Sequence, residues 1–144
     1  MRALIISCLV AISFASCKNN DKPATASDAA LKDSANFTSI QWLDSTNKDF
    51  GKIAEGQKLE VSFHFKNSGE KPLVIASVHP SCGCTVAEQP KEPVAPGNEG
   101  LIKAVFNSEG HTGVNHKTLY VFANTKGTQE SQLNFSVIVE KKKW

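Results

Sequence analysis

The feature that most constrains this fold is a strict alternation of apolar and polar residues between positions 59 and 66. Leu59, Val61, Phe63 and Phe65 each stand next to a polar or charged residue. Because successive side chains of a β-strand point to opposite faces, a period of two predicts a strand with one buried face. We therefore expect residues 59–66 to form one wall of a β-sheet core.

Similar patterns continue along the chain from residue 37. We expect strands over residues 37–42, 50–53, 59–66, 73–78, 101–106, 117–123 and 133–140. Segment 73–78 is apolar on both faces, which is typical of a central strand, and residues 67–69 before it supply turn chemistry. The proline-rich segment 89–100 and segment 107–115 are expected to be loops.

This pattern predicts an all-β domain without a helix of useful length. Seven or eight short strands, with a turn roughly every 8–12 residues, favour an immunoglobulin-like β-sandwich. Its core is expected to consist of the large apolar residues on the inward side of the strands. These are Trp42, Leu59, Val61, Phe63, Phe65, Leu73, Ile75, Ile102, Phe106, Leu119, Val121, Leu133, Phe135 and Val137.

The first 17 residues have the pattern of an export signal. Arg2 precedes an apolar run, residues 3–15, which is too short to span the ~30 Å hydrocarbon core of a bilayer. The run ends in Phe14-Ala15-Ser16-Cys17, which resembles a bacterial lipobox. We therefore expect residues 1–16 to be a lipoprotein signal peptide and Cys17 to carry a palmitate-type lipid. The alternative is a plain signal peptide with an incidental cysteine.

A polar segment separates this cysteine from the predicted domain. Residues 17–36 hold a single large apolar residue, Leu31, and such a segment cannot bury enough surface to offset its ordering entropy. We interpret residues 17–36 as the acylated cysteine and a flexible tether, residues 37–140 as the sandwich, and residues 141–144 as a basic tail. The predicted location is a bacterial membrane of the cell envelope, with the domain facing the periplasm or the cell surface.

Composition and motifs argue against several functional classes. A formal net charge of +2 gives no electrostatic footprint for nucleic acid. The four histidines are scattered, and none forms a recognisable catalytic motif with an aspartate and a serine. The glycines read as turn residues and not as a phosphate loop. We therefore expect a non-enzymatic protein with no cofactor and no nucleic-acid partner.

Two cysteines remain in the predicted domain, Cys82 and Cys84. Cα atoms two residues apart in a flat strand lie ~6.6 Å apart, at the upper edge of the range that a disulfide accepts. Gly83 between them lets the backbone bend, so a bridge is possible. In an exported chain such a bridge can persist.

Three interpretations of this cysteine pair stay open. The first is structural: the pair, bridged or reduced and packed, fixes a bend at the end of a strand. The second is a metal clamp, in which Cys82, Cys84 and His79 bind Cu(I) or Zn. The third is thiol–disulfide chemistry, although redox motifs usually place two residues between their cysteines.

Several short motifs together suggest a family. They are Gly51-Lys52-Ile53, the segment from Phe63 to Gly69, Pro72-Leu73-Val74-Ile75, Ser81-Cys82-Gly83-Cys84-Thr85, Pro96-Gly97 and Phe106-Asn107. Their order resembles that of the bacterial domain-of-unknown-function family DUF1573, over residues 37–139. The resemblance implies an immunoglobulin-like sandwich of the Hydin and major-sperm-protein type. It implies no particular activity.

The expected function follows from the anchor, the tether and the small β domain. We expect a lipid-anchored envelope protein whose immunoglobulin-like domain acts as a scaffold or binds a protein or glycan partner. A periplasmic thiol-redox or Cu/Zn-binding protein that uses Cys82 and Cys84 is the alternative from a different class. A purely structural envelope component is the third possibility.

Overall fold

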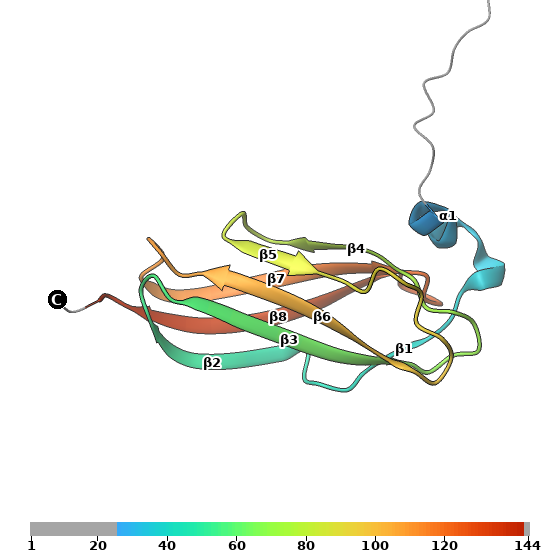
Figure 1. Ribbon diagram of the computed structural model, residues 1–144, viewed down its shortest axis with the longest axis horizontal. Helices are drawn as coiled ribbons and strands as arrows, with labels where there is room; N and C mark the ends of the chain where they lie inside the picture. Colours follow the sequence, from blue (N-terminus) through green and yellow to red (C-terminus); the bar gives the residue numbers. More distant parts are fainter. Residues whose placement is uncertain (1–25, 143–144) are drawn as a thin grey trace, which may run out of the picture.

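The computed structural model describes residues 26–142, and these form two four-stranded sheets packed face to face (Figure 1). The first sheet has the order β1 (Ile40–Trp42), β3 (Lys58–Asn67), β6 (Glu99–Asn107) and β5 (Thr85–Glu88). The second has the order β2 (Asn47–Ala54), β8 (Glu130–Glu140), β7 (Gly113–Ala123) and β4 (Ile75–Pro80). The predicted all-β sandwich is confirmed.

Two long antiparallel ladders form the centre of the sandwich. β3 pairs with β6 so that Phe63 lies opposite Ile102, and β7 pairs with β8 so that Leu119 lies opposite Leu133. β2 joins the outer side of β8 in parallel, with a register shift between Asp49 and Lys52. In each sheet the two edge strands are thus shorter than the two central strands.

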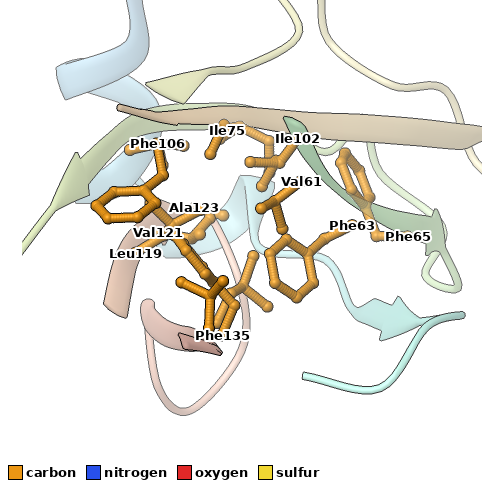
Figure 2. Packing of buried hydrophobic residues seen from close by; sticks show 14 of the residues in the cluster. Val61, Phe63, Phe65, Ile75, Ile102, Phe106, Leu119, Val121, Ala123 and Phe135 are labelled. Atoms are coloured by element: carbon orange, nitrogen blue, oxygen red, sulfur yellow. The ribbon is translucent and has the colours of Figure 1, made fainter. Parts of the chain in front are cut away.

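The core lies between the sheets, where the inward side chains of the period-two strands meet (Figure 2). Twelve of the fourteen predicted core residues are buried; Trp42 and Leu59 are half-buried and pack against the cluster. The structure adds six apolar residues that were not predicted to lie in this core. They are Ile53, Val78, Val94, Ala104, Ala123 and Val139. The alternating pattern therefore identified most of the interior.

The expectation of a central strand at 73–78 is wrong. β4 is an edge strand of the second sheet, and it begins at Ile75 because Leu73 instead forms an isolated bridge with Val94. Ile75 and Val78 of this strand belong to the core, while the segment around Gln89 and the helix that precedes the sandwich lie against its other side. A strand that is covered on its outer side has the same apolar pattern as a central one, which explains the error.

The turn predicted at residues 67–69 has a different physical basis. This segment crosses from the first sheet to the second. Gly69 does not have a positive φ. A Cβ on Gly69 would lie 2.2 Å from the Thr38 hydroxyl oxygen, so glycine is required there by close packing. Asn67 is fully buried rather than exposed at a turn.

Other boundaries differ by a few residues, and one strand was missed. β2, β7 and β8 each begin three or four residues earlier than expected, whereas β1 begins at Ile40. β5 has only four residues directly after the cysteines, which is too short for a periodic signal.

The end of the predicted tether has regular structure. Residues 26–32 form helix α1 (Ala26–Lys32), and a single 3-10 turn, η1 (Ser34–Asn36), follows with Asp33 as its N-cap. α1 lies against β4, and the side-chain amide of Gln129 donates to the Leu31 carbonyl oxygen. The predicted signal peptide and Cys17 lie outside the described residues.

Neither helix within residues 26–142 has the length and apolar character needed to cross a membrane. Figure 1 shows α1 at one end of the sandwich and the last described residues, after β8, at the opposite end.

Candidate functional site

The connection from β4 to β5 carries the chain from the second sheet to the first, and hydrogen bonds fix both of its sides. The Ser81 N–H donates to the Thr118 carbonyl oxygen at 2.8 Å, and the Thr118 N–H donates to Ser81 Oγ at 3.1 Å. On the other side, the Asn107 N–H donates to the Cys84 carbonyl oxygen at 2.9 Å. The bend is therefore held by β7 and β6 independently of the cysteine side chains.

Cys82 and Cys84 are joined by a disulfide within this bend, with their Cα atoms 5.3 Å apart. Both residues are half-buried. The distance is shorter than in a flat strand because the chain turns here. Gly83 lacks a positive φ, and a Cβ built on it would meet nothing within 4 Å. The bend therefore does not depend on the special freedom of glycine.

A threonine hydroxyl lies beside both sulfur atoms. Thr85 Oγ1 is 3.6 Å from Cys82 Sγ and 4.0 Å from Cys84 Sγ, and Thr85 is only 3% exposed. A hydroxyl can donate to a sulfur, and such a bond is stronger when the sulfur is a thiolate. Sequence reasoning did not single out Thr85, because this contact exists only once the chain has bent.

The disulfide borders a hollow of about 510 Å³ on the outer face of the first sheet, which we call the cysteine hollow. Val86 is 66% exposed and pairs with Val105, which gives this surface an apolar floor. The residues that line the hollow are Lys58, Gly83, Cys84, Val86, Val105, Asn107, Glu109 and His111. One sulfur-bearing residue, a cation, a carboxylate and an imidazole thus share a surface.

The third ligand of the predicted metal clamp lies on β4 and has another contact. The His79 ring packs edge-on against Phe122, with ring centroids 5.9 Å apart. Within residues 26–142, no group of three or more His, Cys, Asp or Glu residues is placed to hold a metal ion. Because thiolates are the metal ligands, the bonded Cys82 and Cys84 would first have to be reduced.

A larger hollow of about 810 Å³ lies between β4 and the segment that follows β5; we call it the edge hollow. β4 is the last strand of its sheet, and the Gln89 side-chain amide donates to the Ala76 carbonyl oxygen at 3.2 Å. A side chain thus occupies a place where a further strand would supply a backbone N–H. The lining residues are Val74, Ile75, Ala76, Glu88, Gln89, Pro90, Lys91, Glu92 and Pro93.

An ionic cluster on the outer face of the first sheet was also missed by sequence reasoning. Asp44 Oδ2 accepts hydrogen bonds from the His64 N–H at 2.9 Å and from Lys48 Nζ at 2.9 Å, and it lies 2.8 Å from His64 Nδ1. The His64 backbone N–H, followed by the Lys48 and His64 side chains, holds the pKa of Asp44 well below its usual range. The cluster fastens the β1–β2 connection to β3.

Comparison with known proteins places this fold among other sandwiches. A family model described as "Protein of unknown function (DUF1573)" matches residues 41–139, from β1 to β8. A search of curated proteins found no match.

Three solved structures show the likeness of fold. A protein of unknown function from Porphyromonas gingivalis is 17% identical, with a TM-score of 0.63, over 74% of this chain and 49% of its own. The PapD-like domain 7 of human CEP192 is 12% identical, with a TM-score of 0.53, over 99% of this chain and 100% of its own. The Vibrio cholerae protease VesB is 14% identical, with a TM-score of 0.51, over 72% and 32%.

The chain therefore spans about half of the Porphyromonas protein and a third of VesB. At these identities, the comparisons show a shared immunoglobulin- and PapD-like sandwich.

Proposed function

We propose that this chain, which belongs to the DUF1573 family, is a lipid-anchored binding module of the bacterial cell envelope and not an enzyme. The observation that carries this proposal is the edge hollow, in which the Gln89 side chain hydrogen-bonds the edge strand β4 at Ala76. Edge strands of sandwich domains bind extended peptides by adding a strand. The proposed partner is an extended segment of an envelope protein.

The lining of the edge hollow suits such a segment. Val74, Ile75 and two prolines give apolar walls, while Glu88, Lys91 and Glu92 add charges of both signs. Backbone groups of the peptide would pair with β4, and alternate side chains would contact the walls. β4 has six residues and a register shift after Ile75, so it accepts a short segment rather than a long one.

Anchoring is the second part of the proposal. Its support is the lipobox-like run that ends at Cys17, followed by a polar segment that reaches α1 beside β4. Lipid on Cys17 would hold the domain at the membrane, because each buried methylene contributes about 0.8 kcal/mol and the expected modification adds several chains. The edge hollow would then lie on a module held close to the envelope surface.

The anchor is tested by Cys17→Ala in the full-length chain, with Cys8→Ala in the predicted signal as the matched control. We expect Cys17→Ala to abolish metabolic labelling with palmitate and to remove the protein from the membrane fraction. Cys8→Ala should be labelled and fractionate like the unaltered protein. Equal labelling of both variants would reject lipid attachment at Cys17.

The binding surface is tested by photo-crosslinking in cells that make the full-length protein. A photoreactive residue replaces Lys91 in the edge hollow or, as the control, Asp49 on β2 at the other edge of the same sheet. We expect protein adducts at position 91 and at least fivefold fewer at position 49. Equal adducts at both positions, or none, would reject the edge hollow, and adducts removed by glycosidases would identify a glycan instead.

Gln89→Ala separates strand addition from a simple surface contact. This change frees the Ala76 carbonyl oxygen for the backbone N–H of a partner, so adducts at position 91 should rise about threefold. Glu92→Ala, which lines the same hollow, serves as the control for a general change of its surface. A fall with Gln89→Ala would mean that the side chain itself contacts the partner.

A further inference from the structure

We propose that the Cys82–Cys84 disulfide is a thiol–disulfide exchange site that accepts two electrons from a dithiol of a partner protein. This inference goes beyond the binding function proposed above, because it concerns the cysteine hollow, which shares no lining residue with the edge hollow. It rests on three observations: the access to Cys84, the position of the Thr85 hydroxyl, and backbone bonds that hold the bend without the bridge.

Access to the disulfide is through the cysteine hollow. Cys84 lines this hollow, whereas Cys82 is absent from its lining. The exposed Val86 offers an apolar contact to an incoming segment, and Lys58 and Glu109 give the same surface one charge of each sign. An incoming sulfur is therefore expected to reach Cys84 Sγ first.

The Thr85 hydroxyl favours Cys82 as the leaving group. It lies nearer to Cys82 Sγ, at 3.6 Å, than to Cys84 Sγ, at 4.0 Å. When a thiolate attacks Cys84 Sγ, the bond between the two sulfurs breaks and its electron pair goes to Cys82 Sγ. The Thr85 hydroxyl then donates to the new thiolate, which stabilises it.

The second step completes the transfer. The first step leaves a mixed disulfide between the partner and Cys84. The partner's second thiolate attacks the partner sulfur of that mixed disulfide and displaces the Cys84 thiolate. The partner leaves with a disulfide, having lost two electrons and two protons. Cys82 and Cys84 have gained both and end as thiols.

The sandwich is expected to stay folded when the Cys82–Cys84 disulfide is reduced. A bridge that spans one intervening residue removes little chain entropy from the unfolded state. The bonds from Ser81 to Thr118 and from Asn107 to Cys84 involve backbone or serine groups and do not need the sulfurs to be joined. The chain can therefore alternate between the two redox states while the sandwich stays folded.

The test uses the full-length protein in detergent, without denaturant. Oxidised protein is mixed with reduced glutathione, quenched with acid and alkylated, and the modified residues are located by fragmentation mass spectrometry. We expect glutathione on Cys84 and the alkyl group on Cys82, in at least tenfold excess over the reverse. The reverse pattern, or equal amounts, would overturn the assigned direction of attack.

Dithiothreitol tests whether the exchange is native and whether Thr85 assists it. Unaltered protein should be fully reduced while its circular dichroism stays unchanged. Thr85→Val should be reduced roughly tenfold more slowly, since one hydrogen bond to the leaving thiolate is lost. Thr85→Ser should restore the rate, and Thr112→Val, an exposed threonine on the β6–β7 loop, should leave it unchanged.

Two results would overturn the exchange site itself. One is reduction that occurs only in denaturant or at the rate of global unfolding, because the disulfide would then be structural. The other is equal reduction rates for Thr85→Val and Thr85→Ser, both folded, because the hydroxyl would then have no role. Failure of the crosslinking experiment at the edge hollow would leave both measurements interpretable.

Discussion

At the scale of single residues, two buried asparagines hold together segments that no strand ladder connects. The Asn67 amide donates to the carbonyl oxygens of Lys71, at 2.7 Å, and Val94, at 2.8 Å. Its Oδ1 accepts from the Thr38 hydroxyl at 3.0 Å and from the Gly69 N–H at 3.1 Å. The Asn67 side chain supplies hydrogen bonds to backbone groups of irregular segments, as neighbouring strands do in a sheet, because buried polar groups must be paired.

Asn124 has the same role nearby. Its amide donates to the carbonyl oxygens of Asn36, at 2.8 Å, and Pro72, at 3.0 Å, and its Oδ1 accepts from the Val74 N–H at 2.7 Å. Both asparagines are at most 1% exposed. Most of their partners lie 27 or more residues away in the sequence, so the local pattern does not distinguish these asparagines from turn residues.

Asn67→Ala should lower the free energy of unfolding by about 2–4 kcal/mol, because it leaves several buried polar groups without a partner. Urea unfolding followed by circular dichroism measures this change. Asn98→Ala is the matched control, since Asn98 is exposed and uses its backbone groups for bonding; it should change stability by less than about 0.5 kcal/mol. Similar losses for both variants would contradict the bonding role of Asn67.

The lowered pKa of Asp44 predicts how the free energy of unfolding depends on pH. The fold holds its pKa below the value of about 3.9 expected in the unfolded chain, so the ionised carboxylate stabilises the fold at neutral pH. This contribution is present above about pH 4 and is lost as the pH falls through the folded pKa. Asp44→Asn should therefore be less stable than the unaltered protein at pH 7, and the gap should narrow by pH 3.

Urea midpoints at a series of pH values measure this gap. Glu60→Gln is the control, because Glu60 is an exposed carboxylate on the same face of β3 as His64. Its stability should differ little from that of the unaltered protein, and this difference should vary little with pH. A gap for Asp44→Asn that stays constant from pH 7 to pH 3 would reject the role of the carboxylate charge.

At the scale of elements, the ladder between β3 and β6 depends on a glycine, Gly100, at one position. Gly100 lies opposite Phe65 in the register, and a Cβ built on Gly100 would come within 2.3 Å of the Phe65 ring. The ring thus covers the glycine on the inner face, where Phe65 also meets Trp42 edge-on at 5.8 Å. Gly100 is needed for space and not for a special backbone conformation.

Gly100→Ala should destabilise the domain by about 1–3 kcal/mol, because the Phe65 ring must move out of a packed core. Gly83→Ala is the control: its added Cβ has open space, so stability should change by less than about 0.5 kcal/mol. Thermal unfolding measures both. A loss at Gly83 as large as that at Gly100 would show that the cysteine bend does require glycine.

The elements also show where prediction from sequence succeeded and failed. β3 and β8 have one buried and one exposed face over many residues, so their period-two pattern was sufficient. β4 was predicted to be a central strand because residues 73–78 are apolar on both faces, whereas in the structure it is an edge strand with α1 and the Gln89 segment beside it. The cysteine bend and the edge hollow join residues from different strands, and no local pattern carries that information.

At the scale of the whole molecule, aromatic contacts join the two sheets. The Phe135 ring on β8 meets Phe106 on β6 and Phe50 on β2, each edge-on with ring centroids 6.2 Å apart (Figure 2 labels Phe106 and Phe135). Phe106 belongs to the first sheet and the other two rings to the second. A single side chain thus links both layers of the core.

Phe135→Ala should lower the free energy of unfolding by about 3–5 kcal/mol, because it removes a buried ring and leaves a cavity between the layers. Phe122→Ala, on the half-buried outer face of β7, should cost less than half as much. Urea unfolding monitored by circular dichroism compares the two. Equal losses would mean that contact between the layers is not the dominant source of stability.

The sequence by itself determined most of the large apolar residues that are buried and that they are buried in strands, because alternation along the chain directly encodes two faces. It also contained the motifs that identify the family. Only the tertiary structure decided which strands are neighbours, which edges remain open, and which side chains surround the disulfide. The physical reason is that these relations depend on contacts between residues tens of positions apart, as between Thr38 and Asn67 or Ala54 and Ser108, and such contacts form only when the two sheets have packed.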